Sequence, residues 1–239
     1  MTAADRRVDF DDFAEEYGTI QDTHLRFFGE DMAYFADLKA KTARDLAGPG
    51  PRRILEYGCG TGMNIPRIAA RFPGAVVAGS DVSEKSLRVA QRMNPEVAFF
   101  VAGEKAGAPR EPFDLVVAAN VLHHVPPPER GGVVAEMRSL LASGGSIMIF
   151  EHNPYNPVTR RLVSTCPFDR DAILLTPRET EMLLAAAGFS VRARRYILFF
   201  PAFLRALRFL EKPLGFLPLG GQYCIHAVSP EAAAKGAAG

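Results

Sequence analysis

Three glycines at alternate positions follow a short apolar run and have the spacing of a ligand-binding loop. Gly58, Gly60 and Gly62 come directly after residues 53–57, which have the composition of a buried strand. Glycine tolerates positive φ angles and lets a ligand approach the backbone, because it has no Cβ atom. A second apolar run ends at Asp81, where a carboxylate can accept hydrogen bonds from both hydroxyls of a ribose. This spacing predicts a site for a ligand that contains a nucleoside.

Short apolar runs alternate along the chain with amphipathic stretches. Parallel strands joined by helices produce this alternation, and such sheets bind ligands at the carboxyl edge of their strands. We therefore expect an α/β fold with a doubly wound, mostly parallel sheet and helices on both faces. The expected strands are 53–57, 75–79, 97–101, 113–118 and 146–150, the expected helices are 64–72, 84–93, 129–142 and 177–187, and two further β-rich stretches are 189–199 and 222–229.

The glycine spacing distinguishes between nucleoside ligands. The loop has the pattern GxGxG, which differs from the GxGxxG of dinucleotide-binding loops and lacks the Lys-Ser/Thr pair of a P-loop. Glu56 precedes the loop, where its negative charge disfavours a pyrophosphate. A zwitterionic ligand without phosphate fits better, which argues against a nicotinamide-dependent oxidoreductase.

Two longer motifs carry a resemblance to a known family. The segments Glu56-Tyr-Gly-Cys-Gly-Thr-Gly62 and Phe113-Asp-Leu-Val-Val-Ala-Ala-Asn-Val-Leu-His-His124, together with Asp81, resemble the class I S-adenosylmethionine-dependent methyltransferases. The resemblance covers roughly residues 52–190. It implies the Rossmann-like fold of that family, with a seven-stranded, mostly parallel sheet and an antiparallel last strand. It also implies S-adenosyl-L-methionine as cofactor and S-adenosylhomocysteine as product.

The same resemblance implies roles around the cofactor. Glu56 and the backbone from Gly58 to Gly60 would hold the methionine amino end. Asp81 would bind the ribose, and Val82 would pack against the adenine. Glu104 would meet the adenine amino group, at a position where Asp is commoner. The cofactor-binding residues implied in this way are Tyr17, Glu56, Gly58, Cys59, Gly60, Gly62, Asn64, Asp81, Val82, Glu104 and Asn120.

Three of these assignments have alternatives. Asn64 would cap the following helix and also reach toward the methionine carboxylate, or it would cap the helix alone. Asn120 would face the methionine part of the cofactor through its backbone or through its amide. Tyr17 would cover the cofactor, or it would be a half-exposed aromatic residue on an amphipathic helix.

Three histidines are expected beside the reacting methyl group as catalytic candidates. His123 and His124 follow the fourth expected strand and His152 follows the fifth, so all three lie at the carboxyl edge. A neutral imidazole can take a proton from a hydroxyl or an amine near neutral pH. Positioning alone can also accelerate an in-line methyl transfer, and these histidines would then only stabilise loops. Metal-dependent relatives add carboxylates in a recognisable arrangement that the sequence does not show, so no metal is predicted.

Acceptor-binding residues are expected in two insertions, 152–176 and 200–221. The first is polar and proline-stiffened, in a place where this kind of fold keeps its substrate loops. Arg160 and Arg161 would clamp an anionic group, or they would be a solvated surface pair. The candidate acceptor-binding residues are Tyr155, Arg160, Arg161 and Tyr223.

Composition changes divide the chain further. Residues 1–50 are acidic and predict an N-terminal helical cap or lid, residues 51–230 form the predicted cofactor-binding domain, and residues 231–239 predict a flexible tail. The stretch 196–212 combines basic and large apolar side chains. It therefore suits a pocket wall, peripheral contact with an anionic membrane, or a homodimer contact, and these three alternatives stay open. Packing into the core is favoured over any one of them.

Overall composition excludes several classes of protein. The 239 residues are 48% hydrophobic and 23% charged, which is typical of a globular chain. The net charge of +1 and the acidic first 50 residues argue against nucleic acid as a partner. Three widely spaced cysteines support no disulfide framework, and the N-terminus lacks the apolar core of a signal peptide, so we expect a cytoplasmic protein.

The expected activity is methyl transfer from S-adenosylmethionine to an oxygen, nitrogen or carbon atom of a small molecule. We expect that acceptor to be a partly apolar metabolite or to be lipid-like. Two enzymatic alternatives use the same loop: a non-methylating cyclisation or elimination, and methylation of a protein. A scaffold protein that retains the fold without chemistry is a further alternative.

Overall fold

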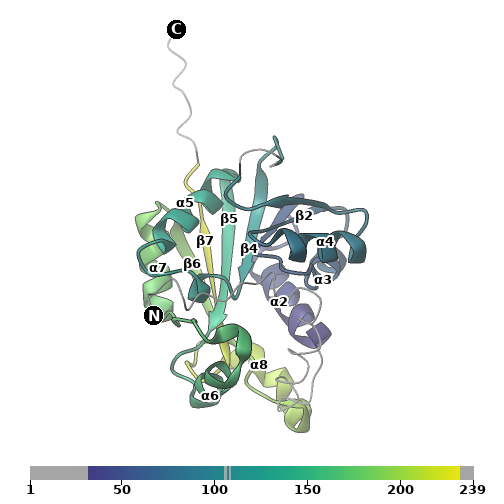
Figure 1. The fold of residues 1–239 in the computed structure, drawn as a ribbon. Helices are drawn as coiled ribbons and strands as arrows, with labels where there is room; N and C mark the ends of the chain where they lie inside the picture. Colours follow the sequence, from purple (N-terminus) through teal and green to yellow (C-terminus); the bar gives the residue numbers. More distant parts are fainter. Residues whose placement is uncertain (1–31, 105–106, 108, 232–239) are drawn as a thin grey trace.

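The computed structural model describes residues 32–104, 107 and 109–231, which contain a seven-stranded sheet (Figure 1). Its strands are β1 (Arg53–Tyr57), β2 (Val76–Asp81), β3 (Ala98–Val101), β4 (Phe113–Ala119), β5 (Leu141–His152), β6 (Ser190–Ile197) and β7 (Gln222–Val228). The strand order is β3-β2-β1-β4-β5-β7-β6. β1 to β5 pair in parallel, whereas β7 is antiparallel to both β5 and β6. The predicted Rossmann-like sheet with an antiparallel last strand is therefore confirmed.

Helices follow the strands largely where the amphipathic stretches predicted them. The α-helices are α2 (Met32–Ala47), α3 (Ile65–Arg71), α4 (Glu84–Met93), α5 (Arg130–Ser139), α6 (Pro157–Thr165), α7 (Pro177–Ala186) and α8 (Glu211–Leu214), and the 3₁₀ segments are η4 (Leu122–His124), η5 (Pro167–Asp169) and η6 (Ala202–Leu210). Local capping fixes several starts. Ser83 accepts a hydrogen bond from the Ser86 amide at the start of α4, and Thr176 with Glu179 forms a capping box that starts α7.

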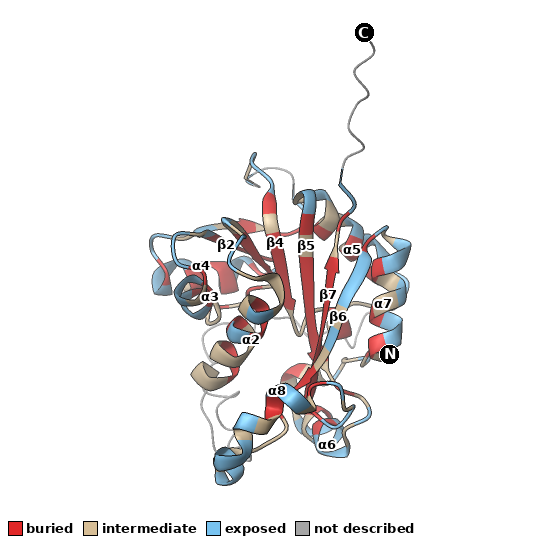
Figure 2. Cartoon of the chain, turned by 180° about the vertical axis from the view of Figure 1, so that it is seen from behind, coloured by how far each residue is buried: buried red, intermediate tan, exposed pale blue. Residues whose placement is uncertain are grey.

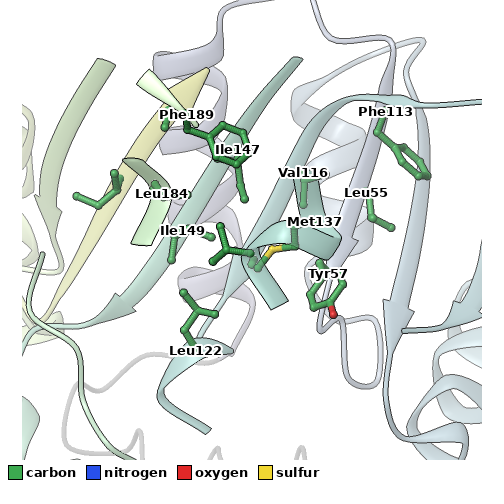
Figure 3. Packing of buried hydrophobic residues seen from close by; sticks show 14 of the residues in the cluster. Leu55, Tyr57, Phe113, Val116, Leu122, Met137, Ile147, Ile149, Leu184 and Phe189 are labelled. Atoms are coloured by element: carbon green, nitrogen blue, oxygen red, sulfur yellow. The ribbon is translucent and has the colours of Figure 1, made fainter. Parts of the chain in front are cut away.

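Each face of the sheet has its own hydrophobic core, because successive side chains of a strand point to opposite faces. Leu55 and Tyr57 of β1 pack with Met137 of α5 and Leu184 of α7 on one face (Figure 3). Ile54 packs on the other face, against apolar residues of α2 and α3. The central strands β4 and β7 are buried along most of their length, and β5 is buried from Ile147 to Glu151 (Figure 2). Glu56 lies between Leu55 and Tyr57 in the sequence, so its side chain points to the opposite face of the sheet, which α2 covers.

The boundary between α5 and β5 differs from the prediction. The sequence predicted a helix to residue 142 and a strand from 146, but β5 already begins at Leu141. Phe113 pairs with Leu141, whereas Leu115 pairs with Ser146, so β5 contains extra residues at a bulge. The glycines at this bulge broke the apolar pattern on which the prediction depended.

The N-terminal prediction can be compared with the structure only from residue 32 onward. There α2 packs on the sheet, and Asp37 forms an ion pair with Arg71 of α3 at 2.6 Å. Tyr17 lies outside the described residues, and its predicted role stays a prediction. Within the described part of the chain, no helix combines the length and the apolar character that a membrane crossing requires.

The two predicted insertions lie beyond the carboxyl ends of the parallel strands (Figure 1). α6 and η5 belong to the first insertion, and η6 and α8 belong to the second. The Asn153 side chain donates hydrogen bonds to the Pro218 and Gly220 carbonyls, at 3.1 and 2.7 Å. This amide ties the two insertions together above the edge where a ligand would bind.

Candidate cofactor and acceptor sites

A cavity of about 380 Å³ opens at the carboxyl edge beside the loop that follows β1. Its walls include Gly58, Gly60, Thr61, Asp81, Val82 and Asn120. Five of these six positions are predicted cofactor residues, and Thr61 lies inside the predicted loop. We call this space the cofactor cavity.

The glycine loop has a shape that larger residues could not adopt. Gly58 has a φ of 70°, and a Cβ atom there would lie 2.4 Å from the Val121 side chain. Gly60 has a φ of 52°, and a Cβ atom there would meet no atom of the described residues within 4 Å. The space in front of Gly60 is therefore the open cradle that a ligand needs in order to approach the backbone.

Asp81 is held in place by the backbone around it. Its Oδ2 accepts a hydrogen bond from the Gly60 amide at 2.8 Å, and its Oδ1 accepts one from the Ser83 amide at 2.9 Å. An ionised carboxylate can accept about four hydrogen bonds. Asp81 is thus oriented before a ligand arrives, at the wall of the cofactor cavity.

A second cavity, of about 130 Å³, lies under α2 and α6. It shares Asn120 and His124 with the cofactor cavity. Its apolar wall is formed by Phe35, Leu162, Val163, Phe168 and Leu198, and its polar wall includes Lys39, His123, His152 and Asp169. Among the described residues, only Asn120 and His124 line both cavities. We call this second space the acceptor cavity.

Asn120 stands at the junction in a strained conformation. Its φ is 60°, in the left-handed region that non-glycine residues seldom occupy. Its amide N–H donates to the Phe150 carbonyl at 2.8 Å, and its Oδ1 accepts a hydrogen bond from Gln222 at 3.2 Å. Residues in such conformations persist where the surrounding structure holds them, and they cluster at binding sites.

The three histidines lie together beside this junction. The rings of His123 and His124 are 4.1 Å apart between centroids, and those of His123 and His152 are 5.1 Å apart. His123 Nδ1 lies 2.5 Å from Glu151 Oε2, inside the protein. His124 Nδ1 lies 3.3 Å from Asp171 Oδ1. The structure therefore brings all three catalytic candidates together.

Burial and nearby charges give the histidines different pKa values. Burial acts to lower the pKa of His123, but the carboxylates of Glu151 and Asp169 outweigh it and raise the value to about 9. Burial and the neighbouring His123 charge lower the pKa of His124 to about 4, and the same causes lower the pKa of His152 to about 4. His124 and His152 are therefore neutral at pH 7, with a ring nitrogen that can accept a proton.

Lys39 is a site residue that sequence reasoning missed. It lies on α2, lines the acceptor cavity, and also borders a small cavity next to Glu56. Burial lowers its pKa, against the opposing effect of the Glu56 and Glu151 carboxylates. A signal existed, because Phe35 and Lys39 are four residues apart and so lie on one face of the helix. A lysine on the apolar face of a helix indicates a functional or paired amine.

Glu56 and Asn64 differ from their predicted roles. Glu56 does not line the cofactor cavity, because strand alternation turns its side chain to the α2 face, where it is 1% exposed. Burial raises its pKa to about 7. Asn64 precedes α3 but makes no side-chain cap, and its amide instead donates to Glu56 Oε1. The two side chains pair with each other on the far side of the loop.

Three other predicted cofactor residues lie outside the cavity lining. Cys59 is buried, and its thiol contacts the Gly60 carbonyl. Gly62 packs so closely on α4 that a Cβ atom would lie 2.9 Å from the Asn94 side chain. Glu104 is exposed and does not reach the cavity in this structure. Cys59 and Gly62 thus contribute to the shape of the loop, and the cofactor roles of all three residues stay predictions.

The predicted acceptor-binding residues are also absent from both cavity linings. Tyr155, Arg160 and Arg161 are exposed to solvent at and before α6. Tyr223 is fully buried, and its hydroxyl pairs with Thr180 at 2.7 Å. Because its position in β7 faces the core next to α7, Tyr223 packs the fold and does not touch the acceptor cavity.

Comparison with known proteins finds relatives of the part of the chain that contains the glycine loop and Asp81. A methyltransferase-domain family model matches residues 54–145. Trans-aconitate 2-methyltransferase of Azoarcus sp. is 31% identical over 166 residues, which cover 67% of this chain and 65% of that protein. Ubiquinone biosynthesis O-methyltransferase of Alkalilimnicola ehrlichii is 36% identical over 48% of this chain and 47% of that protein. The chain thus spans less than two thirds of the length of these relatives.

Solved structures share the fold. A methyltransferase of Archaeoglobus fulgidus superimposes with a TM-score of 0.59 at 18% identity, over 81% of this chain and 94% of that one. Magnesium protoporphyrin IX methyltransferase of Synechocystis, solved with bound S-adenosylhomocysteine, gives a TM-score of 0.57 at 18% identity, over 92% of this chain and all of that one. Together with the family model and the glycine loop, these findings show that the chain belongs to the class I S-adenosylmethionine-dependent methyltransferases.

Proposed function

We propose that this protein transfers a methyl group from S-adenosylmethionine to a small, partly apolar acceptor. The observation that carries the proposal is the junction of the two cavities at Asn120 and His124. In-line methyl transfer needs the sulfonium and the acceptor atom in separate pockets that meet at the methyl group. Holding the two reactants in that geometry can supply most of the rate enhancement.

The cofactor cavity has the features that S-adenosylmethionine requires. The open cradle at Gly60 leaves room for the cofactor against the backbone, and the fixed Asp81 carboxylate suits two ribose hydroxyls. Val82 is 70% exposed and lines the cavity, which gives an adenine ring an apolar contact. The cofactor would supply an electrophilic methyl group, and the chain would orient it toward the acceptor cavity.

The acceptor cavity supports the second half of the proposal. Phe35, Leu162 and Leu198 offer an apolar surface at one side, while His124 and Asn120 stand where the reacting atom would lie. An acceptor with an apolar body and a polar reacting end suits this distribution. The neutral rings of His124 and His152 provide two candidate proton acceptors for such a group.

We also infer that the acceptor reaches the protein at an anionic lipid surface. Phe203 and Phe209 of η6 are 77% and 74% exposed, and Phe216, in the turn after α8, is 73% exposed. This segment projects from the rest of the described chain (Figure 1). Arg205 is exposed on this segment, whereas Glu211 is turned inward and accepts hydrogen bonds from the Phe199 and Phe200 amides. Exposed aromatic rings beside basic side chains are typical of peripheral membrane contacts.

The test of the function begins with thermal denaturation. A ligand at 100 times its dissociation constant adds about 2.7 kcal/mol of stability, or roughly 5 to 10 °C for a chain of this size. We expect this shift with S-adenosylmethionine and S-adenosylhomocysteine but not with NAD. Extracts of apolar metabolites and lipids are then screened by mass spectrometry for a gain of one methyl group. A shift with NAD alone, or a product without added methyl, would contradict the proposal.

A further inference from the structure

A group of metal-ligating side chains, one buried and two half-buried, lies in the wall of the acceptor cavity. His123, His152 and Asp169 each offer one ligand atom, and these atoms all lie within 4.8 Å of one another. His123 Nε2 and Asp169 Oδ1 are 3.4 Å apart. Ligands at about 2.0 to 2.2 Å from a four-coordinate ion are separated by about 3.4 Å. The spacing within this pair is therefore that of two ligands of one ion.

Glu151 holds the Nδ1 side of the His123 ring, in the way that a carboxylate holds a metal-binding histidine. His123 Nδ1 lies 2.5 Å from Glu151 Oε2, and both side chains are fully buried. Glu151 Oε1 is itself fixed by the Leu122 amide at 2.7 Å and the Val121 amide at 3.2 Å. Histidines that bind metals usually donate their second ring N–H to a carboxylate in this way. An ion bound at Nε2 would displace the proton with which this nitrogen otherwise faces Asp169.

The other ring nitrogen of His123, Nε2, is a buried polar atom without a hydrogen bond to the described residues. Among the described residues, His123 Nε2 has no hydrogen-bond partner, although its side chain is 0% exposed. Buried polar atoms are almost always paired, and an exception calls for an explanation such as an ion. His123 Nε2 lies on the side of the ring that faces Asp169.

We propose that His123, His152 and Asp169 bind a divalent first-row transition-metal ion. Two imidazoles and one carboxylate suit Zn²⁺ or Fe²⁺, and three protein ligands leave at least one coordination position open. All three side chains line the acceptor cavity, so the open position faces the place where an acceptor binds. Glu151 positions His123 and does not itself bind the ion.

The site narrows the class of acceptor, and this step rests on the proposed function. An acceptor hydroxyl or carboxylate can fill the open position with its oxygen, and a hydroxyl bound to the ion loses its proton more easily. For a hydroxyl, the oxygen then forms a bond to the methyl carbon while the sulfur–carbon bond breaks, which yields a methyl ether, S-adenosylhomocysteine and one proton released to solvent. The metal site therefore favours oxygen as the methylated atom.

Metal binding can be measured without cofactor or acceptor. Full-length protein is stripped with a chelator, the chelator is removed, and Co²⁺ is added while the visible absorption of the bound ion is recorded; Zn²⁺ binding is followed by calorimetry. We expect one ion per chain, with ligand-field bands of nitrogen and oxygen coordination. Absence of stoichiometric binding of both ions would overturn the proposal, whether or not the protein methylates anything.

Matched variants assign the ligands. We expect Asp169→Asn and His152→Ala each to weaken Co²⁺ binding by at least about tenfold, and Glu151→Gln to weaken it by about 10 to 100 times without changing the number of ions bound. Asp37→Asn makes the same chemical change on α2 outside both cavities, and His226→Ala removes a histidine outside both cavities. Both controls should bind Co²⁺ as the unchanged protein does.

Circular dichroism identifies the variants that fold. Asp169→Asn and His152→Ala test two ligands independently, so the failure of one variant to fold does not end the test. If Co²⁺ affinity and spectrum are unchanged in folded Asp169→Asn and His152→Ala, the assigned site is wrong. A methyltransferase assay is not needed for this conclusion. An active enzyme that binds no metal would leave the proposed function intact and exclude the metal site alone.

Discussion

The backbone amide of Gly60 donates a hydrogen bond of 2.8 Å to Oδ2 of Asp81 and so joins the loop after β1 to the end of β2. The two motifs that the sequence presents separately are one structural unit. The carboxylate fixes the loop, and the loop fixes the carboxylate. Because the unit is formed without a ligand, binding need not order it, which lowers the entropic cost of binding.

Replacement of Asp81 tests this unit. We expect Asp81→Ala to weaken S-adenosylmethionine binding by at least about tenfold, because the ribose would lose charge-assisted hydrogen bonds and the loop would lose its anchor. Isothermal titration calorimetry measures the affinity. Asp37→Ala, which removes a carboxylate from a surface ion pair on α2, is the matched control. Equal affinity of Asp81→Ala and the control would rule out the ribose role.

The conformation of Asn120 leads to a stability prediction. A non-glycine residue in the left-handed region costs roughly 1 to 2 kcal/mol relative to glycine. Asn120→Ala and Asn120→Gly lose the same hydrogen bond from Gln222, but only alanine keeps a Cβ atom at a φ of 60°. We therefore expect the free energy of unfolding of Asn120→Ala to lie about 1 kcal/mol below that of Asn120→Gly. Urea denaturation checks this order, and the reverse order would show that the backbone stores no strain there.

The raised pKa of Glu56 leads us to predict that the stability of the protein depends on pH. Burial raises its pKa from 4.5 to about 7, so the folded protein binds one proton more than the unfolded chain between these values. The free energy of unfolding therefore falls as the pH rises through this window. Glu56→Gln cannot ionise and lacks this contribution, so between pH 5 and pH 8 its free energy of unfolding should fall by about 2 kcal/mol less than that of the unchanged protein. Parallel urea titrations at both pH values measure the difference; identical slopes with pH would mean that Glu56 ionises normally.

The exposed phenyl rings of η6 predict membrane association. Burial of one such side chain contributes about 1.5 to 3 kcal/mol, so Phe203→Ser with Phe209→Ser should weaken binding to vesicles that contain phosphatidylserine by at least about tenfold. Met182→Ser alters another exposed apolar residue, which lies on α7, and should leave vesicle binding unchanged. Co-sedimentation measures both. If the double variant binds like the control, the segment has another partner.

The cofactor loop could be predicted from the sequence because its chemistry is local. Gly58 and Gly60 adjoin one strand end, Asp81 is at the next, and parallel pairing of β1 with β2 brings them together. Glu56 was misplaced although strand alternation contained the information. Its neighbours Leu55 and Tyr57 belong to one face, so Glu56 had to belong to the other.

The acceptor cavity could not be predicted in the same way. Asp169, Lys39 and Gln222 come from three separate parts of the chain, and only the packing of α2, η5 and β7 around the sheet edge brings them to one cavity. Tyr223 illustrates the opposite error. A polar aromatic residue at the start of a strand resembles a binding residue, but its hydroxyl is satisfied inside the core by Thr180 and the Leu175 carbonyl.

The family model ends at residue 145, and most of the acceptor cavity is built from residues 32–39 and 152–222. Most residues of the acceptor cavity thus lie outside the stretch that carries the cofactor motifs, and the two stretches pack on each other through α2 on α3 and α7 on α5 as well as at the sheet. A chimera that takes the outer stretches from a relative and keeps residues 54–145 should therefore inherit the relative's selectivity while retaining this protein's own donor affinity. Residues 54–145 would then be the part shared between relatives, and the outer stretches would be the part that can be exchanged.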